Sequence, residues 1–301
     1  MKKLSELVEK AKNLEKKMRI SVAVAQDEVV LEAVEDARKN GIIDATFVGD
    51  QKEIEKIAKK LNIDLSNYEV INETEELEAT KKAVELVHTY HCDLLMKGKV
   101  HTADLLHAVL DKNFNLRTGK TMNHVGVFEV PSYDRLLIIT DAAMVIAPTL
   151  EQKVDSIYNA IKVAHVIDID LPKVAILGAV ETVSPAMPAT LDAALIAKMY
   201  DRKQITGAIV DGPFALDNAV SEEAARHKGI GGPVAGHADI LLVPDIEAGN
   251  ILYKGLIFIA KGKLAGTIVG ARVPIVLTSR ADDAETRLYS IALSALLAKV
   301  G

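Results

Sequence analysis

Short apolar segments alternate with longer segments of helical periodicity along nearly the whole chain, and this alternation restricts the fold more than any other feature. The first three apolar segments are Ser21–Ala25, Ala45–Gly49 and Tyr68–Ile71. Apolar runs of about four to eight residues between turn residues are typical of buried strands. Because strands separated by helices pair in parallel, with helices on the faces of the sheet, the sequence predicts an α/β fold.

The same alternation continues towards the C-terminus. Further strands are expected at Asp93–Met96, Val125–Val130, Arg135–Thr140, Lys173–Gly178, Gly207–Gly212 and Asp239–Pro244, with two more near Thr267 and Ile275. Helices are expected between them, including Glu151–Ile167 and Leu216–His227. Asp27 is a typical N-cap and Gly41 a typical stop signal, so we expect the helix between them to end near Asn40.

The length of 301 residues suits two domains or one large α/β unit. The sequence contains no long linker, so a domain boundary must lie in a short loop. The best candidate for the point where the chain passes from the first domain to the second is Ala147–Thr149. Gly262–Gly266 is a candidate for the point where it returns to the first domain. We therefore expect one α/β domain from residues 1–146 plus 266–301 and a second from residues 147–265, both with mostly parallel sheets.

Composition excludes several classes of protein. The net charge of −6 argues against a nucleic-acid-binding protein, which usually has a basic domain. No apolar run approaches the roughly 20 residues that span a bilayer, so no membrane partner is expected. Cys92 is the one cysteine, which fits a reducing compartment and predicts a cytoplasmic protein.

Polar residues follow several of the expected strands. In open α/β sheets, ligands bind beyond the carboxyl ends of the strands, so these residues are candidates for contacting a substrate. The candidates after the fourth and ninth strands are Lys97, Lys99, His101, Asp245 and Asn250.

Ser279 and Arg280 stand where the last expected strand gives way to the final helix. Backbone amides and the positive dipole end at a helix start, combined with an arginine that donates two parallel hydrogen bonds, form a site for an anion. The alternative is that Asp282 caps the helix, Glu285 completes a capping box and Arg280 only pairs with an acid. A capping box does not explain an arginine at the end of a strand, so we favour anion binding.

A basic pair, Arg117 and Lys120, lies in the segment Asn115–Gly126, which contains the letters GKT. A phosphate-binding P-loop requires glycine where Phe114 stands, and no strand leads into the segment, so nucleotide hydrolysis is rejected. The basic pair either contacts phosphate or belongs to a solvated loop.

Two other motifs fail the tests for cofactor sites. Lys228–Gly236 is rich in glycine, but Val234 takes the last glycine position of the dinucleotide fingerprint and the segment precedes a strand. His88, His91 and Cys92 have no second ligand cluster, so no metal site is expected.

Six blocks of the chain, in order, resemble those of the phosphate acetyl/butyryltransferase family, most closely its butyryl branch. They are SVAVAQDEVVLEAVEDA, LRTGKTMNHVGVFEV, DRLLIITD, VDGPFALDNAVSEEAARHKGI, GHADILLVPDIEAGNILYK and VLTSRADDAETRLYSIALSAL. The resemblance covers essentially the whole chain. It implies two α/β domains with a cleft between them, similar in architecture to isocitrate and isopropylmalate dehydrogenases. It also implies the reversible reaction of acyl-CoA with phosphate to acyl phosphate and CoA, by direct transfer without an acyl-enzyme or a metal.

The resemblance also implies roles for individual residues. In the acetyl branch a Ser-Arg pair binds the reacting groups, and Ser279 and Arg280 match it. That branch uses an aspartate to help deprotonate the CoA thiol, and here its position is Thr286. Asp283 or Glu285 is therefore expected to supply the base.

Two further arginines of the family have different residues here. One of them is replaced by His107, and the other falls near Asn123 and His124, so His124 is expected to bind substrate. The sequence blocks of the butyryl branch match this chain without such replacements.

The sequence therefore predicts a cytoplasmic acyltransferase that moves a butyryl-type group between coenzyme A and phosphate. We expect no tightly bound cofactor, no metal and a homo-oligomer, a dimer or larger. Three alternatives stay open. They are a phosphate acetyltransferase acting on acetyl- or propionyl-CoA, a decarboxylating dehydrogenase of the same architecture, and a non-catalytic binder of acyl-CoA or phosphate.

Overall fold

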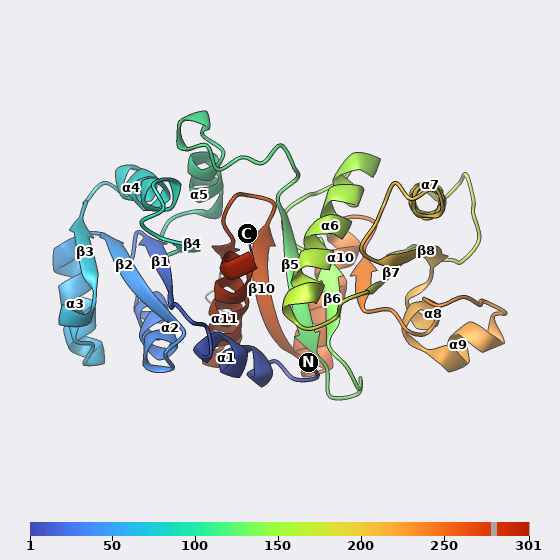
Figure 1. Ribbon diagram of the computed structural model, residues 1–301, viewed down its shortest axis with the longest axis horizontal. Helices are drawn as coiled ribbons and strands as arrows, with labels where there is room; N and C mark the ends of the chain where they lie inside the picture. The colour runs from blue at the N-terminus through green and yellow to red at the C-terminus, as the bar shows by residue number, and fades with distance from the viewer. Residues whose placement is uncertain (278–281, 301) are drawn as a thin grey trace. The chain divides into compact units, whose positions relative to one another are not determined.

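The expected alternation of strands and helices is present throughout the residues that the computed structural model describes, 1–277 and 282–300. Contacts divide the chain into two units (Figure 1). The N-terminal unit consists of Ser5–Lys120 and Ala265–Gly301, and the central unit consists of Met1–Leu4 and Thr121–Leu264. The domain boundary expected at Ala147–Thr149 lies later in the chain than this division, and it stays a prediction.

The sheet of the N-terminal unit has the strand order β3-β2-β1-β4-β11-β10. Its strands are β1 (Met18–Ala23), β2 (Ile43–Gly49), β3 (Glu69–Asn72), β4 (Leu94–Lys97), β10 (Lys263–Val269) and β11 (Ile275–Val276). All the pairs from β3 to β11 are parallel, and β10 pairs with β11 in the antiparallel sense. The carboxyl ends of five strands therefore share one edge.

The helices of this unit form two groups (Figure 1). They are α1 (Ser5–Lys12), α2 (Glu28–Lys39), α3 (Gln51–Leu61), α4 (Glu76–His88), α5 (Thr102–Val109) and α11 (Ala284–Val300), with short 3-10 turns at Leu65–Asn67 and Lys112–Phe114. Helix α11 contacts α1 and α2, α2 contacts α3, and α4 contacts α5. This arrangement covers the sheet with helices, as the buried strands required.

Helix α2 shows how local sequence sets these elements. The Asp27 carboxylate accepts hydrogen bonds from the amides of Val29 and Val30, which satisfies donors that have no partner inside the helix. Gly41 has φ +74°, a left-handed conformation that favours glycine, and it ends the helix where expected.

The central unit has the strand order β5-β6-β9-β7-β8, with β5 antiparallel to β6 and the other pairs parallel. Its strands are β5 (Asn123–Glu129), β6 (Leu137–Thr140), β7 (Lys173–Leu177), β8 (Ile209–Phe214) and β9 (Ile240–Leu242). Its helices are α6 (Leu150–Val166), α7 (Pro188–Asp201), α8 (Leu216–Val220), α9 (Glu222–His227) and α10 (Ile246–Lys254), which continues as a π-helical turn, η3 (Gly255–Ile259). Mostly parallel sheets in both units confirm the predicted α/β class.

Two local predictions were wrong. The single helix expected at Leu216–His227 is two helices, because Ser221 is extended and its side chain accepts the amide of Ala224 as a new N-cap. The cap of α11 is Asp283 and not Asp282, because the Asp283 carboxylate accepts the amide of Thr286 at 2.8 Å.

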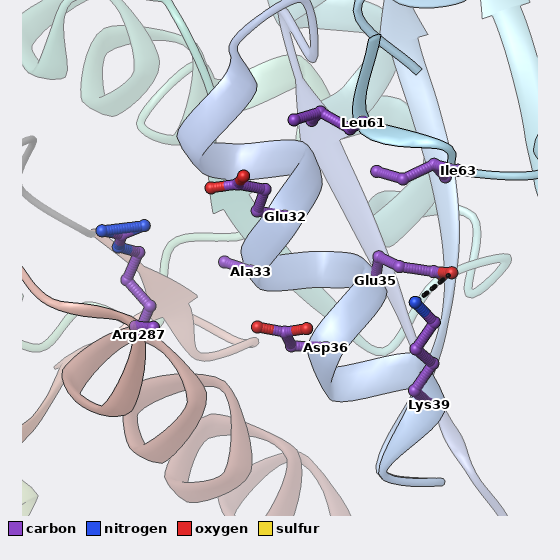
Figure 2. Close-up of a pocket in the computed structure, with 9 residues that line it drawn as sticks. Glu32, Ala33, Glu35, Asp36, Lys39, Leu61, Ile63 and Arg287 are labelled. Carbon is purple, nitrogen blue, oxygen red and sulfur yellow. Dashed lines mark ion pairs between the residues drawn. The ribbon is translucent and has the colours of Figure 1, made fainter. Parts of the chain in front are cut away.

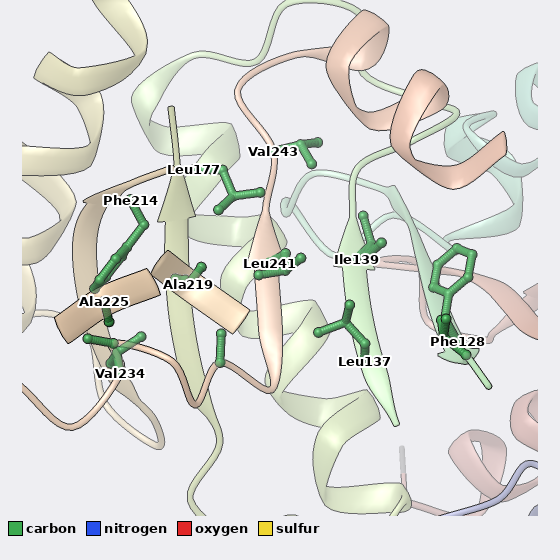
Figure 3. Packing of buried hydrophobic residues seen from close by; sticks show 14 of the residues in the cluster. Phe128, Leu137, Ile139, Leu177, Phe214, Ala219, Ala225, Val234, Leu241 and Val243 are labelled. Atoms are coloured by element: carbon green, nitrogen blue, oxygen red, sulfur yellow. The ribbon is translucent and has the colours of Figure 1, made fainter. Parts of the chain in front are cut away.

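The core of the central unit is a continuous apolar cluster between β5, β6, β7, β8 and β9 and the helices that cover them (Figure 3). Phe128 and Phe214 are its largest members, with 0% and 1% of their surface exposed. The cluster holds the strands in register, so it fixes where their carboxyl ends lie.

Within residues 1–277 and 282–300, no helix is long and apolar enough to cross a bilayer.

Candidate active site

At the carboxyl edge of the N-terminal unit, β4 and β11 end side by side. Val276 pairs with Met96, and Lys97 pairs with Ala23 on the other side of β4. The loop that follows β4 and the chain that follows β11 therefore leave the sheet from neighbouring positions on one edge. Ser279 and Arg280 lie outside the described residues, so their predicted role rests on this topology and on the sequence.

The three candidates after β4 are placed differently. The Lys97 ammonium is half-buried and donates to the carbonyls of Gly98 and Val100, at 3.0 and 3.3 Å. Lys99 and His101 are exposed, and the His101 side chain makes no capping bond to α5. Lys97 thus shapes the loop, while Lys99 and His101 present their side chains to solvent.

Gly98 allows this loop to lie directly against the loop after β1. A Cβ at Gly98 would collide with the backbone oxygens of Ala23 and Val24, and the Gly98 amide donates to the Ala23 carbonyl at 2.8 Å. Val24 itself has φ +56°, which is uncommon for a β-branched residue. The edge is therefore built from close backbone packing between two strand ends.

The proposed bases both lie in the first turn of α11. Asp283 is exposed and caps the helix, and Glu285 is exposed and accepts from the Tyr289 hydroxyl at 3.4 Å. Neither carboxylate is buried, and which of them acts as the base stays a prediction.

Arg117 is not brought to the carboxyl edge of its unit. It is exposed and pairs through its backbone with Ala271, in the turn that precedes β11, while the Thr118 hydroxyl donates to the Gly270 carbonyl at 2.5 Å. The last residue of β11 lies at the carboxyl edge, whereas Ala271 precedes its first residue. Arg117 therefore lies at the other end of that strand. Lys120 is exposed in the same loop.

The carboxyl edge of the central unit carries a turn that begins at Asp141. Its carboxylate accepts the amides of Ala143, Met144 and Val145 at 2.9, 3.0 and 2.9 Å. The side chain of Asn250 donates to the Ala142 carbonyl at 3.1 Å, which ties helix α10 to the turn. Sequence reasoning did not single out Asp141, although its position directly after a buried strand was a usable signal.

Helix α10 approaches this turn closely. A Cβ at Gly249 would lie 2.6 Å from the Asp141 carbonyl oxygen, so only glycine permits the contact. Asp245, a predicted substrate ligand, caps α10 by accepting the Ala248 amide at 2.8 Å. Asp245 at the cap and Asn250 within α10 therefore each bond a backbone group, and these bonds hold the backbone at this edge.

His124 lies at the start of β5, beside the end of β6, and only 8% of its surface is exposed. Its Nδ1 is buried without a hydrogen-bond partner among the described residues, and its ring meets the Tyr253 ring edge-on at 6.3 Å. Burial lowers the pKa of His124, while the charge of Asp141 acts in the opposite direction. The ring is thus a neutral, packed group, and its predicted contact with substrate stays a prediction.

A chain of hydrogen bonds between buried polar side chains ends at the backbone of His124. Asn159 donates to Asn123, and Asn123 donates to the Thr140 hydroxyl, both at 2.5 Å. The Thr140 hydroxyl donates in turn to the His124 carbonyl at 2.9 Å. Because every member is buried, the chain fixes the backbone of His124 against the end of β6.

Another polar cluster at this edge was missed from the sequence. Glu181, after β7, accepts from Asn218 at 3.2 Å and from Lys228 at 3.4 Å, and Lys228 also reaches Asp217 at 3.0 Å. Lys228 opens the glycine-rich segment, so the ion pairs anchor that segment to the edge. The contact joins residues distant in the chain, which local patterns do not reveal.

Across residues 1–277 and 282–300, no group of three or more His, Cys, Asp or Glu side chains is arranged to hold a metal ion. Burial raises the pKa of the Cys92 thiol to about 11, so Cys92 is a protonated, packed side chain. The carboxyl edges of the two units carry the ammonium groups of Lys97 and Lys228 and the carboxylates of Asp141, Glu181 and Asp245.

Comparison with known proteins agrees with this architecture. The chain matches the family described as Phosphate acetyl/butaryl transferase over residues 3–82 and 72–295. It is 54% identical to a phosphate butyryltransferase from Clostridium acetobutylicum, over 99% of both chains. It is 53% identical to a phosphate acetyltransferase from Thermotoga maritima, over 98% of this chain and 99% of that one.

Solved structures of related proteins have the same fold. A branched-chain phosphotransacylase from Enterococcus faecalis V583 superposes with a TM-score of 0.83 at 34% identity, over 93% of this chain and 99% of that chain. A 4-hydroxythreonine-4-phosphate dehydrogenase from Klebsiella pneumoniae superposes with a TM-score of 0.51 at 14% identity, covering 94% of this chain and 100% of that chain, which shows the fold alone. The expected likeness to dehydrogenases is thus confirmed at the level of fold. The chain belongs to the phosphate acetyl/butaryl transferase family.

Proposed function

We propose that this protein catalyses the reversible transfer of a butyryl-type acyl group between coenzyme A and inorganic phosphate. The reaction is butanoyl-CoA + phosphate = butanoyl phosphate + CoA. The observation that carries the proposal is the 54% identity to the Clostridium acetobutylicum phosphate butyryltransferase over 99% of both chains. Phosphate-dependent release of CoA from butyryl-CoA tests it, and a protein that only binds acyl-CoA or phosphate would release none.

The chemistry sets the requirements for the site. A phosphate oxygen attacks the thioester carbonyl, negative charge grows on the carbonyl oxygen, the C–S bond breaks and CoA leaves as a thiolate. Phosphate needs a cationic partner with paired donors, and the carbonyl oxygen needs fixed donors. We assign these tasks to Arg280 and Ser279, with the backbone amides at the start of α11.

Proton transfer to and from the CoA sulfur needs a base, because a thiol has an ordinary pKa of about 8.5. We assign this role to Asp283 or Glu285 in the first turn of α11. The loop from Lys97 to His101 supports the assignment, because β4 and β11 end on one edge of the N-terminal unit. We assign substrate contacts to Lys99 and His101 there and to His124 in the central unit. The contacts expected for Arg117 and Lys120 stay predictions, because their loop lies at the other end of β11.

A second candidate function is transfer of an acetyl or propionyl group. It is favoured by the phosphate acetyltransferase from Thermotoga maritima, which is 53% identical to this chain. The two candidates require acyl pockets of different depth, so relative rates with different acyl-CoA substrates separate them.

We expect butyryl-CoA to be used about tenfold better than acetyl-CoA, measured as kcat/KM. Each methylene buried against apolar wall contributes about 0.8 kcal/mol, so two of them give roughly this ratio. A phosphate-dependent CoA-release assay with acetyl-, propionyl-, butyryl- and isobutyryl-CoA measures it. Equal or higher kcat/KM with acetyl-CoA would favour the second candidate.

We expect the activity to persist after treatment with EDTA. The described residues offer no set of ligands for a metal, and the proposed groups provide the positive charge that a metal would otherwise supply. CoA release is measured before and after dialysis against the chelator. A loss that a divalent ion restores would contradict this prediction and favour a metal-dependent class, such as a decarboxylating dehydrogenase.

We also propose that the protein acts in the cytoplasm as a homo-oligomer, with acyl-CoA and phosphate as its small-molecule substrates. The support for the cytoplasm is the single, buried cysteine. Light scattering of the purified protein measures the oligomeric state directly.

A further inference from the structure

An arginine in the first turns of α11 makes an unusual contact. Arg287 donates from Nε and Nη2 to one acceptor, the backbone carbonyl of Asp282, at 3.2 and 2.5 Å. Only 9% of the Arg287 surface is exposed. A buried guanidinium with two donors on one carbonyl holds that carbonyl in place more firmly than a single neutral hydrogen bond does.

The surroundings show that this contact is not an ordinary ion pair. Arg287 borders a cavity of about 360 Å³ between α2, the end of α3 and α11 (Figure 2). Glu32 and Asp36, one turn apart on α2, also line this cavity, yet neither carboxylate pairs with Arg287 or with any other cation in the described part of the chain. Arg287 instead directs its donors at the backbone of Asp282.

The position of Asp282 gives the contact its significance. Asp282 lies two residues after Arg280 and directly precedes the cap residue Asp283. The Arg287 amide also donates to the Asp283 carbonyl, at 3.2 Å. The start of α11 is thus held by two side chains, the Asp283 carboxylate that caps it and the Arg287 guanidinium.

We propose that Arg287 is a positioning residue for phosphate binding, acting through the Asp282 carbonyl on the start of α11. This inference rests on the proposed function, in which Ser279, Arg280 and the α11 amides bind the phosphate. Arg287 touches neither substrate in this scheme. Its loss removes the bonds that hold the Asp282 carbonyl at the start of α11, and it removes no group that binds phosphate in the proposed function.

The test compares Arg287→Ala, Arg287→Lys and the matched control Arg272→Ala. Arg272 also donates to backbone carbonyls, those of Val87 and His88, at 3.2 and 2.8 Å, but it lies in the turn before β11. We expect Arg287→Ala to raise the KM for phosphate about tenfold, the effect of losing one charged hydrogen bond, with a much smaller change in the KM for butyryl-CoA. The lysine variant keeps the charge and one donor, so we expect an intermediate value. The control should leave the KM for phosphate unchanged.

The cavity makes a rescue experiment possible. Removal of the side chain enlarges a space already lined by Glu32 and Asp36, so millimolar ethylguanidine should enter it and restore at least half of the lost phosphate affinity in Arg287→Ala only. A KM for phosphate that stays at the wild-type value overturns the inference. So does a loss shared equally by both substrates and by the melting temperature, without rescue, because it would assign Arg287 a purely structural role.

Amide hydrogen exchange gives a readout that does not depend on turnover. We expect faster exchange in the first turn of α11 in Arg287→Ala, and unchanged exchange there in the control. Unchanged exchange in both variants overturns the inference. If the wild-type protein releases no CoA, the proposed function has failed, and the exchange result still decides whether Arg287 holds the start of α11.

Discussion

Replacing Arg280 by alanine should raise the KM for phosphate and lower kcat, with a combined loss on the order of 3 kcal/mol in transition-state stabilisation, a factor of roughly 150 in kcat/KM. Strand β11 ends with Val276 at the carboxyl edge, where ligands of parallel sheets bind, and Arg280 comes four residues later in the sequence. Its guanidinium matches two phosphate oxygens, and alanine removes both the charge and the paired donors. Initial rates of CoA release at varied phosphate concentration measure the effect.

Two further variants sharpen this test. Arg280→Lys keeps the charge but loses the planar pair of donors, so its activity should fall between wild type and alanine. Arg202 is an exposed arginine that follows α7, and Arg202→Ala should be indistinguishable from wild type. All three proteins should melt near the wild-type temperature. A variant Arg280→Ala that unfolds, with full activity in its folded fraction, would instead make Arg280 a structural ion-pair partner.

Replacing Phe128 by alanine should lower the free energy of unfolding by about 3–5 kcal/mol. The Phe128 ring is fully buried in the central cluster (Figure 3). It meets the Tyr253 ring of α10 edge-on at 5.7 Å. Alanine leaves a void there that the neighbouring strands cannot close, because they are fixed by their ladder bonds. Urea denaturation followed by circular dichroism measures the loss.

Phe258→Ala is the matched control for this experiment, because it removes the same atoms from a side chain that is 60% exposed. We expect its effect to stay within about 0.5 kcal/mol. Equal losses for the two variants would show that burial does not govern the contribution of phenylalanine in this unit.

Much of the fold follows from local sequence patterns. Strands such as Ala45–Gly49 and Lys173–Gly178 were expected within two residues of their observed bounds, because buried parallel strands are continuously apolar. The cap at Asp27 and the stop at Gly41 follow from the chemistry of single residues. The family was recognisable from six ordered blocks, and the comparisons confirm it.

The details that local patterns did not predict depend on tertiary contacts. The break at Ser221 was missed because the apolar periodicity continues through it. The burial of His124 depends on Tyr253, more than a hundred residues away in the chain. Likewise, a half-buried Lys97 that serves its own loop cannot be distinguished by sequence from one that reaches into solvent.

The turn after β6 has a thermodynamic consequence for binding. Ordering a flexible backbone costs roughly 1–2 kcal/mol per residue, and a loop that orders only around its ligand loses that amount from the affinity. Here the Asp141 carboxylate already holds three successive amides, and Gly249 packs against the same turn. The entropy of this segment is therefore lost when the protein folds, and a substrate that binds beside it meets a preorganised surface.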